Sequence, residues 1–179
     1  YDDQFKGMIP LREALAESRN AVAIWITGQI GIASVLRTSR SLGVRTRLQP
    51  YATTALGASE VILLELANAY RTMASGILAQ PYLIRKIVQD SGAIAVDEEH
   101  GRFPVDIDEA ALALIQEGMR GVVRIPAGTA HALESRGFPI AVMGKTGTTN
   151  EFRDALFVGS TYGPEGITVA VRLGFDDNR

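Results

Sequence analysis

The sequence predicts an α+β fold, an α/β sandwich in which helices flank an antiparallel sheet. Segments with the apolar spacing of helices fill most of the first two thirds of the chain. Three short runs rich in Val, Ile, Phe and Thr close it. The 179 residues are enough for one domain with its own core, and without any cysteine that fold contains no disulfide.

Helix signals begin at Pro10, which suits a first helical turn. Gly31 and Gly43 close two further apolar-periodic segments, as left-handed caps do. Ser59 is expected to cap the N-terminus of the next helix, and Asp108 lies near the start of the last one. The helices are expected at 10–18, 20–31, 32–43, 59–76 and 106–123, with a loop at 44–58.

Strand signals follow the fourth helix. Two short β-branched runs within 82–98 surround Asp90-Ser91-Gly92, a sequence typical of a hairpin turn. Further runs at 138–149, 154–162 and 167–175 are separated by turn residues. Because such short, closely spaced runs pair most simply with their neighbours, we expect a meander of antiparallel strands.

Composition excludes some function classes. The formal net charge is -2 and no face gathers Lys and Arg, so nucleic acid is not expected as a partner. Apolar runs such as 21–26 are far shorter than the roughly 18 to 20 residues of a membrane span. The chain also begins without Met and shows no targeting segment. We therefore expect a piece of a longer polypeptide.

Gly144-Lys145-Thr146 matches the end of a phosphate-binding P-loop. That motif needs a glycine five positions earlier, where this chain has Pro139. It must also lead into a helix whose N-terminus faces the phosphate, whereas this segment leads into an apparent strand. The pattern therefore argues against a nucleotide-binding site.

The same residues suit the edge of a peptide-binding groove. Lys145 would supply a positive charge, and the hydroxyls of Thr146 and Thr148 could bind a carboxylate. Gly147, which has no side chain, would let an extended peptide lie against the strand. An acyl-transfer enzyme also needs a nucleophile, a base and a proton relay, so partners must lie elsewhere.

Ser18-Arg19-Asn20 lies upstream at a predicted helix end. Ser-x-Asn followed by Lys-Thr-Gly resembles two of the three motifs of penicillin-binding proteins and class A β-lactamases. The sequence as a whole resembles the transpeptidase domain of penicillin-binding proteins, most of all the class A bifunctional ones. The stretches that carry this resemblance are "LREALAESRNAVAI", "LGASEVILLELANAYRTMASG", "PYLIRKIV", "MGKTGTTNEFRDALFVG" and "LGFDDNR".

The resemblance implies the fold shared by serine β-lactamases and these transpeptidases, with a five-stranded antiparallel sheet flanked by helices. It implies a D,D-transpeptidase that cross-links peptidoglycan through an acyl-enzyme formed from a D-Ala-D-Ala stem peptide. It also implies binding of β-lactam antibiotics, and no cofactor or metal. The expected location is the outer face of the bacterial cytoplasmic membrane, where an N-terminal helix tethers the parent protein.

The resemblance also assigns roles to residues. Ser18 would relay a proton to the leaving amine, and Asn20 would hydrogen-bond the donor peptide. Lys145 would contact Ser18 and add electrostatic support. Thr146 and Thr148 would bind the terminal carboxylate beside Gly147, and the Thr148 N–H would form half of the oxyanion hole.

The family nucleophile lies in Ser-x-x-Lys, which this chain does not contain. The residues three positions before its three lysines are Asp3, Leu83 and Val142. We therefore expect residues 1–179 to be a partial transpeptidase domain, inactive alone, with Ser-x-x-Lys supplied by the upstream part of the same protein or by a second chain. The alternatives are a D,D-carboxypeptidase, a β-lactamase-like hydrolase or a noncatalytic substrate-binding module.

Several other residues are given structural interpretations. Trp25 and Tyr70 are expected in the core. His100 and His131 lack metal-ligand spacing around them, so surface or hydrogen-bonded positions are expected. Arg153 and Asp154 are expected to form an ion pair at the strand crossing.

Overall fold

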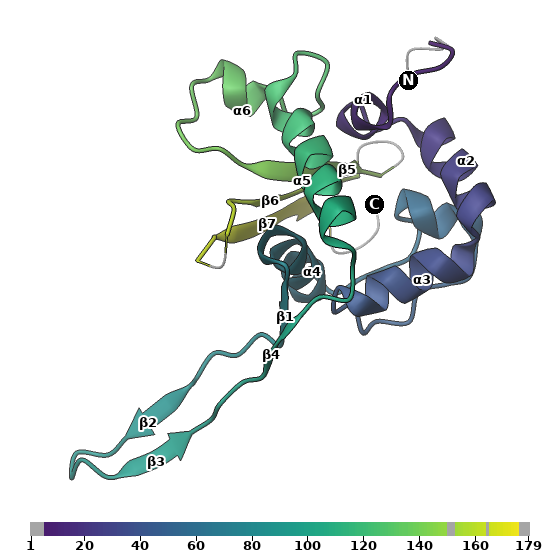
Figure 1. Ribbon diagram of the computed structural model, residues 1–179. Coiled ribbons are helices and arrows are strands. Elements are labelled where there is room, and N and C mark those ends of the chain that lie inside the picture. Colours follow the sequence, from purple (N-terminus) through teal and green to yellow (C-terminus); the bar gives the residue numbers. More distant parts are fainter. Residues whose placement is uncertain (1–5, 150–152, 164, 176–179) are drawn as a thin grey trace.

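The computed structural model describes residues 6–149, 153–163 and 165–175. Figure 1 shows an arch of N-terminal helices, a sheet crossed by a long helix, and an arm that projects away from both. The helices are α1 (Leu11–Ala16), α2 (Asn20–Ile30), α3 (Ile32–Ser41), the 3-10 helix η1 (Ala52–Leu56), α4 (Leu63–Ser75), α5 (Glu109–Arg124) and α6 (Ala132–Ser135). The strands are β1 (Ile77–Ala79), β2 (Lys86–Val88), β3 (Ile94–Asp97), β4 (Arg102–Pro104), β5 (Met143–Thr148), β6 (Asp154–Ser160) and β7 (Thr168–Gly174).

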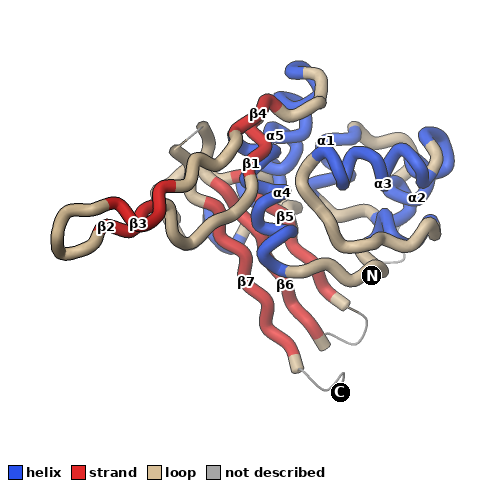
Figure 2. Tube along the Cα trace, turned by 90° about the horizontal axis from the view of Figure 1, so that it is seen from below, coloured by secondary structure: helices blue, strands red, loops and turns tan. Residues whose placement is uncertain are grey.

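The last three strands form one antiparallel sheet in the order β5-β6-β7. Lys145 is paired with Val158, and Phe157 with Val171. Helices α4 and α5 pack against this sheet, as Figure 2 shows from below. The predicted α+β fold and the meander are therefore confirmed.

The expected number of five strands is not met in this sheet. Within the described ranges it has three, because the four earlier strands pair among themselves outside it. β1 pairs with β4 at the base of the arm, and β2 pairs with β3 near its tip. Gly92 occupies the turn between β2 and β3 with φ +83°, which confirms the predicted hairpin.

Glycines set the corners of the helical arch. Gly31 has φ +78° and separates α2 from α3, two helices bent by 97°. Gly43 has φ +101° just after α3. Both glycines thus have the positive φ that was expected, but the ψ of 143° at Gly31 places this residue outside the left-handed helical region of a regular cap. In the described part of the chain no single helix is long and apolar enough to cross a bilayer, and α2 and α3 reach that length only as this bent pair.

Ser59 does not cap α4, which begins at Leu63 after Ile62 and without a side-chain cap. Its hydroxyl instead accepts a hydrogen bond from the Gln49 N–H at 3.1 Å and shares one of 2.8 Å with Thr54 Oγ1. These bonds stabilise η1, where the sequence predicted only loop. The Ser59 hydroxyl is therefore hydrogen-bonded within the loop and does not cap the helix.

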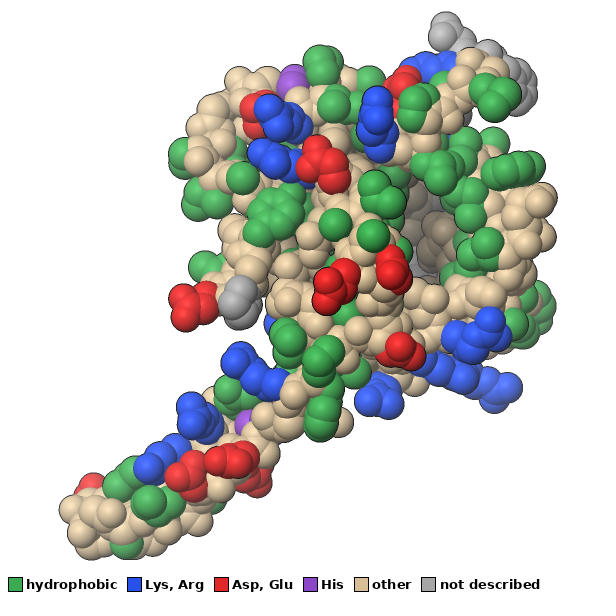
Figure 3. All heavy atoms as spheres, viewed as in Figure 1, with side chains coloured by type: hydrophobic (Ala, Val, Ile, Leu, Met, Phe, Trp, Pro, Cys, Tyr) green, Lys and Arg blue, Asp and Glu red, His purple; other side chains and the backbone are tan. Residues whose placement is uncertain are grey.

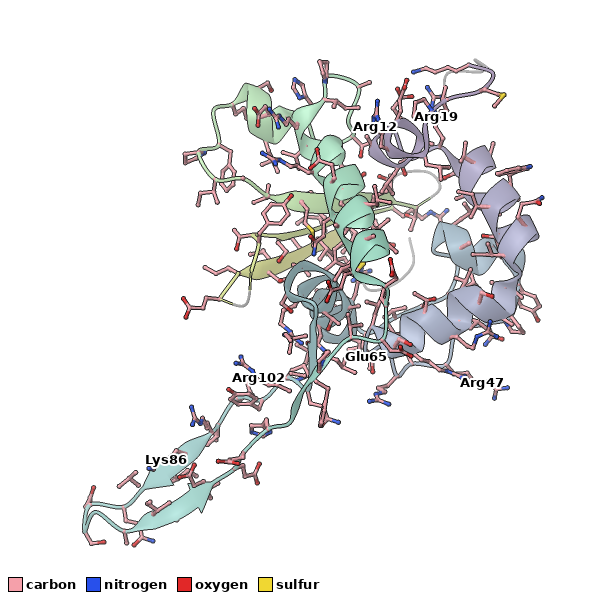
Figure 4. All side chains as sticks on the ribbon, viewed as in Figure 1. Arg12, Arg19, Arg47, Glu65, Lys86 and Arg102 are labelled. Atoms are coloured by element: carbon pink, nitrogen blue, oxygen red, sulfur yellow. The ribbon has the colours of Figure 1, made fainter. Side chains whose placement is uncertain are left out.

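Glu65, labelled in Figure 4, connects α4 to the segment that leaves α3. Its carboxylate accepts hydrogen bonds from the backbone N–H groups of Arg45 at 3.0 Å and Thr46 at 2.9 Å. The bond from Thr46 is the main reason that the pKa of Glu65 lies below its usual value. This carboxylate therefore holds the segment that follows the arch against α4.

The core has two clusters, both of which include residues of α5. The first joins Met119 to Met143 of β5, with Tyr70 packed against it, as predicted. Burial raises the pKa of Tyr70 to about 12. The second cluster joins Val122 to Phe157 of the sheet. Helix α5 therefore fixes the position of β5, which carries Lys-Thr-Gly.

The prediction for Trp25 is wrong, since this residue is 63% exposed. It lies on α2, whose apolar residues surround the helix rather than forming one stripe, so packing covers only part of them. Ile30 at the end of the same helix is also exposed. Figure 3 shows hydrophobic side chains gathered along this arch and a hollow between the arch and the body.

Candidate functional site

Two predicted site residues from opposite ends of the chain are in contact. Lys145 in β5 donates a hydrogen bond from Nζ to Ser18 Oγ at 2.7 Å. The same ammonium donates to the carbonyl oxygen of Thr146 at 3.0 Å. The structure therefore brings Ser18 of Ser-x-Asn into contact with Lys145 of Lys-Thr-Gly.

Close packing of α1 on α5 sets the position of Ser18. Ala14 and Ala16 of α1 are buried, and glycines of α5 lie against Leu15 and Ala16. A Cβ atom on Gly118 would lie 2.8 Å from Leu15 Cδ2, and one on Gly121 would lie 3.4 Å from Ala16 Cβ. Small residues thus let the two helices approach closely, and α1 ends two residues before Ser18.

Ser18 has an unusual backbone conformation. Its φ is +56°, and among the residues that the structure describes no other non-glycine residue has a positive φ. The N–H of Ser18 donates to Leu15 O at 3.1 Å, and the N–H of Arg19 donates to Ala14 O at 2.9 Å. The left-handed residue therefore ends α1 and turns the Ser18 hydroxyl toward β5 at a cost of about 1 kcal/mol or more.

Glu17 braces this turn from the side. Its carboxylate accepts hydrogen bonds from Lys6 Nζ and from Arg19 Nε, both at 2.7 Å, although the Glu17 side chain is only 6% exposed. Figure 4 shows Arg19 at the corner between α1 and α2. Chiefly the Lys6 bond, and then the Arg19 bond, hold the pKa of Glu17 below its usual value. A carboxylate with two cationic partners therefore lies directly before Ser18.

Burial lowers the pKa of Lys145, because the ammonium loses contact with water. A lysine of this kind gives up a proton more readily than an exposed one. With the Ser18 hydroxyl hydrogen-bonded to it, proton exchange between the two groups needs no rearrangement. The pair can therefore serve as a proton relay to a reacting group placed beside Ser18.

A residue that the sequence analysis missed completes this arrangement. Thr129, which follows α5, shares a hydrogen bond of 2.7 Å between its Oγ1 and Thr146 Oγ1. Its N–H donates to Ala16 O at 3.1 Å. The only sequence signal was a Gly-Thr pair after a predicted helix, which is too common to indicate a site.

The remaining predicted residues lie around this contact without joining it. Asn20 is the exposed first residue of α2, and Thr148 is the exposed last residue of β5. Gly147 lies opposite Leu156, where a Cβ atom would come within 3.4 Å of Leu156 Cβ. Between the described atoms, no hydrogen bond connects the side chain of Asn20 or Thr148 with Lys145.

Asp154 forms its ion pair with Arg172 of β7, at 2.6 Å, and so joins β6 to β7. The sequence analysis had paired Asp154 with Arg153, but Arg172 lies on the neighbouring strand at hydrogen-bonding reach. The backbone N–H of Asp154 also donates to Thr149 Oγ1 at 2.8 Å. These contacts close the end of the β5–β6 hairpin directly after Thr148.

The histidines make local contacts away from this site. His100 stacks on Tyr82 with ring centroids 4.0 Å apart, and His131 Nδ1 lies 3.2 Å from Val123 O. Among the described residues, no three His, Cys, Asp or Glu side chains come together as metal ligands would. A pocket of about 270 Å³ beside Arg120 and Arg124 contains none of the predicted site residues.

Comparison with known proteins places these features in context. The family described as "Penicillin binding protein transpeptidase domain" matches residues 1–171. The chain is 34% identical to penicillin-binding protein 1A of Aquifex aeolicus, covering 98% of this chain and 23% of that protein. It is 33% identical to penicillin-binding protein 1B of Vibrio cholerae, covering 100% of this chain and 22% of that protein.

Solved structures of penicillin-binding proteins have a similar fold. The crystal structure of penicillin-binding protein 1A from Haemophilus influenzae matches with a TM-score of 0.83 at 25% identity, covering 98% of this chain and 31% of that one. An imipenem acyl-enzyme complex of penicillin-binding protein A from M. tuberculosis matches with a TM-score of 0.77 at 18% identity, covering 96% and 44%. The chain thus spans less than half the length of each of these proteins.

Proposed function

The chain belongs to the penicillin-binding protein transpeptidase domain family, and we propose that it forms two walls of a serine-type D,D-transpeptidase site. One wall is Ser-x-Asn, with Ser18 and Asn20, and the other is Lys-Thr-Gly, with Lys145 and Thr146. The observation that carries the proposal is the 2.7 Å hydrogen bond between Lys145 and Ser18. This bond joins two motifs that lie far apart in the sequence and that a transpeptidase site needs side by side.

The reaction would proceed in two acyl transfers. A serine nucleophile attacks the carbonyl of the penultimate D-Ala of a stem peptide, and the bond to the terminal D-Ala breaks. The lysine of Ser-x-x-Lys takes the proton of the attacking serine. Ser18 passes its own proton to the departing amine and regains one from that lysine, while the Lys145 ammonium stabilises the charge around Ser18. An amine of a neighbouring peptidoglycan strand then attacks the acyl-enzyme, and the new amide bond replaces the bond to the serine. The proton that the amine loses returns to the serine oxygen.

Substrate binding would use the end of β5 and the start of α2. Thr146 and Thr148 offer hydroxyls to the terminal carboxylate of the peptide or of a β-lactam, and Gly147 leaves room for the chain beside them. Asn20, exposed at the start of α2, would hydrogen-bond the amide of the donor peptide. The Thr148 N–H would donate into the oxyanion hole.

The nucleophile would come from outside these 179 residues. Ser-x-x-Lys does not occur in the sequence, and the chain covers only 22% to 31% of the class A proteins compared above. Residues 1–179 would then be part of a transpeptidase domain, completed by the upstream part of the same protein or by a second chain. The parent protein would act at the outer face of the bacterial cytoplasmic membrane.

Penicillin labelling tests this proposal. The parent protein should gain the mass of one penicillin on a Ser-x-x-Lys serine, whereas the isolated chain should gain none. An adduct on Ser18 would contradict the assignment of Ser18 as a relay. A parent that binds peptides ending in D-Ala-D-Ala but forms no adduct would instead be a binding module.

Product analysis separates the related activities. A transpeptidase joins the acyl group to an added amine, whereas a D,D-carboxypeptidase or a β-lactamase-like hydrolase passes it to water. The parent protein, given a stem peptide and an amine acceptor, should form the cross-linked product. Release of free acid alone would favour the hydrolases.

A further inference from the structure

The loop after α5 contacts the Lys-Thr-Gly wall and the end of α1, the helix that leads into Ser18. The N–H of Thr129 donates to Ala16 O at 3.1 Å, two residues before Ser18. The hydroxyl of the same residue shares a hydrogen bond of 2.7 Å with the hydroxyl of Thr146. Thr129 therefore bridges the end of α1, which leads into Ser18, and the Lys-Thr-Gly wall.

The loop that carries Thr129 is held from beneath. The N–H of Ala130 donates to Val122 O at 3.0 Å, and the N–H of Gly128 donates to Ile125 O at 2.9 Å. A Cβ atom on Gly128 would lie 2.4 Å from Val122 O, so the loop lies against the backbone of α5. With Ala130 buried in the second core cluster, the loop fixes the position of the Thr129 side chain.

Two hydroxyls that share one hydrogen bond leave one proton free for another acceptor. If Thr129 donates to Thr146 Oγ1, the proton of Thr146 remains available to a ligand. Without Thr129, the Thr146 hydroxyl could rotate and donate to other acceptors, and a ligand would have to reorient it.

We propose that Thr129 is a positioning residue that donates its hydroxyl proton to Thr146 and so directs the Thr146 hydroxyl toward the terminal carboxylate of the bound peptide. This inference rests on the proposed function, since it assumes that Thr146 binds that carboxylate. It adds a residue outside the three sequence motifs, and it predicts that Thr129 acts through Thr146 rather than by contact with the ligand.

The test measures binding rather than acylation, so it does not depend on the nucleophile. A peptide ending in D-Ala-D-Ala is titrated into the parent protein, and binding is followed by NMR. The same titration is made on four variants: Thr129→Val, Thr129→Ser, Thr146→Val and the double variant Thr129→Val with Thr146→Val. The same peptide with its terminal carboxylate converted to an amide serves as the matched ligand. Thermal unfolding of each variant checks that it is folded.

We expect Thr129→Val to weaken binding of the carboxylate peptide about five- to tenfold, the equivalent of one hydrogen bond. Thr129→Ser should bind as the unmodified protein does, because it keeps the hydroxyl. Thr129→Val should have no effect on the amide peptide, nor any further effect once Thr146 is Val. If Val at 129 prevents folding, Thr129→Ala at this exposed position carries the same expectations.

Other outcomes overturn the proposal separately from the function. Unchanged binding by Thr129→Val, or a loss that adds fully to that of Thr146→Val, contradicts the positioning role and leaves the transpeptidase proposal intact. If the unmodified parent does not prefer the carboxylate peptide to the amide, the carboxylate role of Thr146 fails, and the role of Thr129 fails with it.

Discussion

The ammonium of Lys145 donates a hydrogen bond of 2.7 Å to the hydroxyl of Ser18, which lies 127 positions earlier in the chain. The two groups reach each other because α1 packs on α5 and α5 packs on β5. Burial of the ammonium costs free energy, which hydrogen bonds to a neutral hydroxyl and to the Thr146 carbonyl oxygen offset only in part. We therefore expect the contact to matter more for the proposed reaction than for stability.

Replacing Lys145 should separate these two contributions. In the parent protein, Lys145→Met should change the unfolding free energy by less than about 1 kcal/mol, because the lost hydrogen bonds are offset by removal of a buried charge. Acylation by penicillin should fall about 100-fold or more, as when a transition-state donor is lost. Thermal unfolding and penicillin labelling measure the two effects. Lys86→Met, on the exposed arm, is the control and should change neither.

The pH dependence of stability should report the same burial. In the folded state the pKa of Lys145 lies below its ordinary value of 10.5, which applies to the unfolded chain. At a pH between the folded-state pKa and 10.5, the unfolded chain therefore binds more protons than the folded protein does. Stability then rises with pH through this window. In urea titrations, the unmodified protein should gain stability relative to Lys145→Met as the pH approaches 10.5. A constant difference would show that Lys145 is solvated.

Ser18 allows a test of backbone strain. Because its φ is +56°, Ser18→Gly should relieve the left-handed conformation, whereas Ser18→Ala should keep it. We expect the Gly variant to be the more stable by about 1 kcal/mol in urea unfolding. Both remove the hydroxyl and should reduce acylation equally. Equal stability of the two variants would mean that the turn is not left-handed in solution.

Sequence reasoning reached the motifs and the order of elements, since apolar period, turn residues and Lys-Thr-Gly are local signals. It could not reach Thr129, whose role depends on where α5 ends relative to β5. It failed at Trp25, because the sequence shows that a helix is apolar but not which of its faces finds a partner. Asp154 forms its ion pair with Arg172 on the neighbouring strand rather than with Arg153, because the pairing of strands brings residues together that are distant in the sequence.

Glu17 should make the Ser18 turn sensitive to acid. Hydrogen bonds from Lys6 and Arg19 hold its pKa below the ordinary value of 4.5, so its contribution to stability is present above that pH and lost as the pH falls through the lowered value. Glu17→Gln should therefore flatten the fall in stability below about pH 4.5, measured by thermal unfolding. Glu60→Gln, at an exposed loop position, is the matched control. An identical acid profile for the protein and its Glu17→Gln variant would contradict this role.

Gly128 should tolerate no side chain, in contrast to a helical glycine of the arch. A Cβ atom there would lie 2.4 Å from Val122 O and 2.7 Å from Gly121 O, both backbone atoms that cannot move independently of α5. Gly128→Ala should cost about 1 to 3 kcal/mol of unfolding free energy. Gly28→Ala in α2, with no atom within 4 Å of its Cβ, should stabilise the protein by about 0.5 to 1 kcal/mol.

Because Gly128 fixes the loop of Thr129, its substitution should also weaken carboxylate binding in the folded fraction. Unchanged binding by a folded Gly128→Ala protein would show that this loop does not position the Lys-Thr-Gly wall.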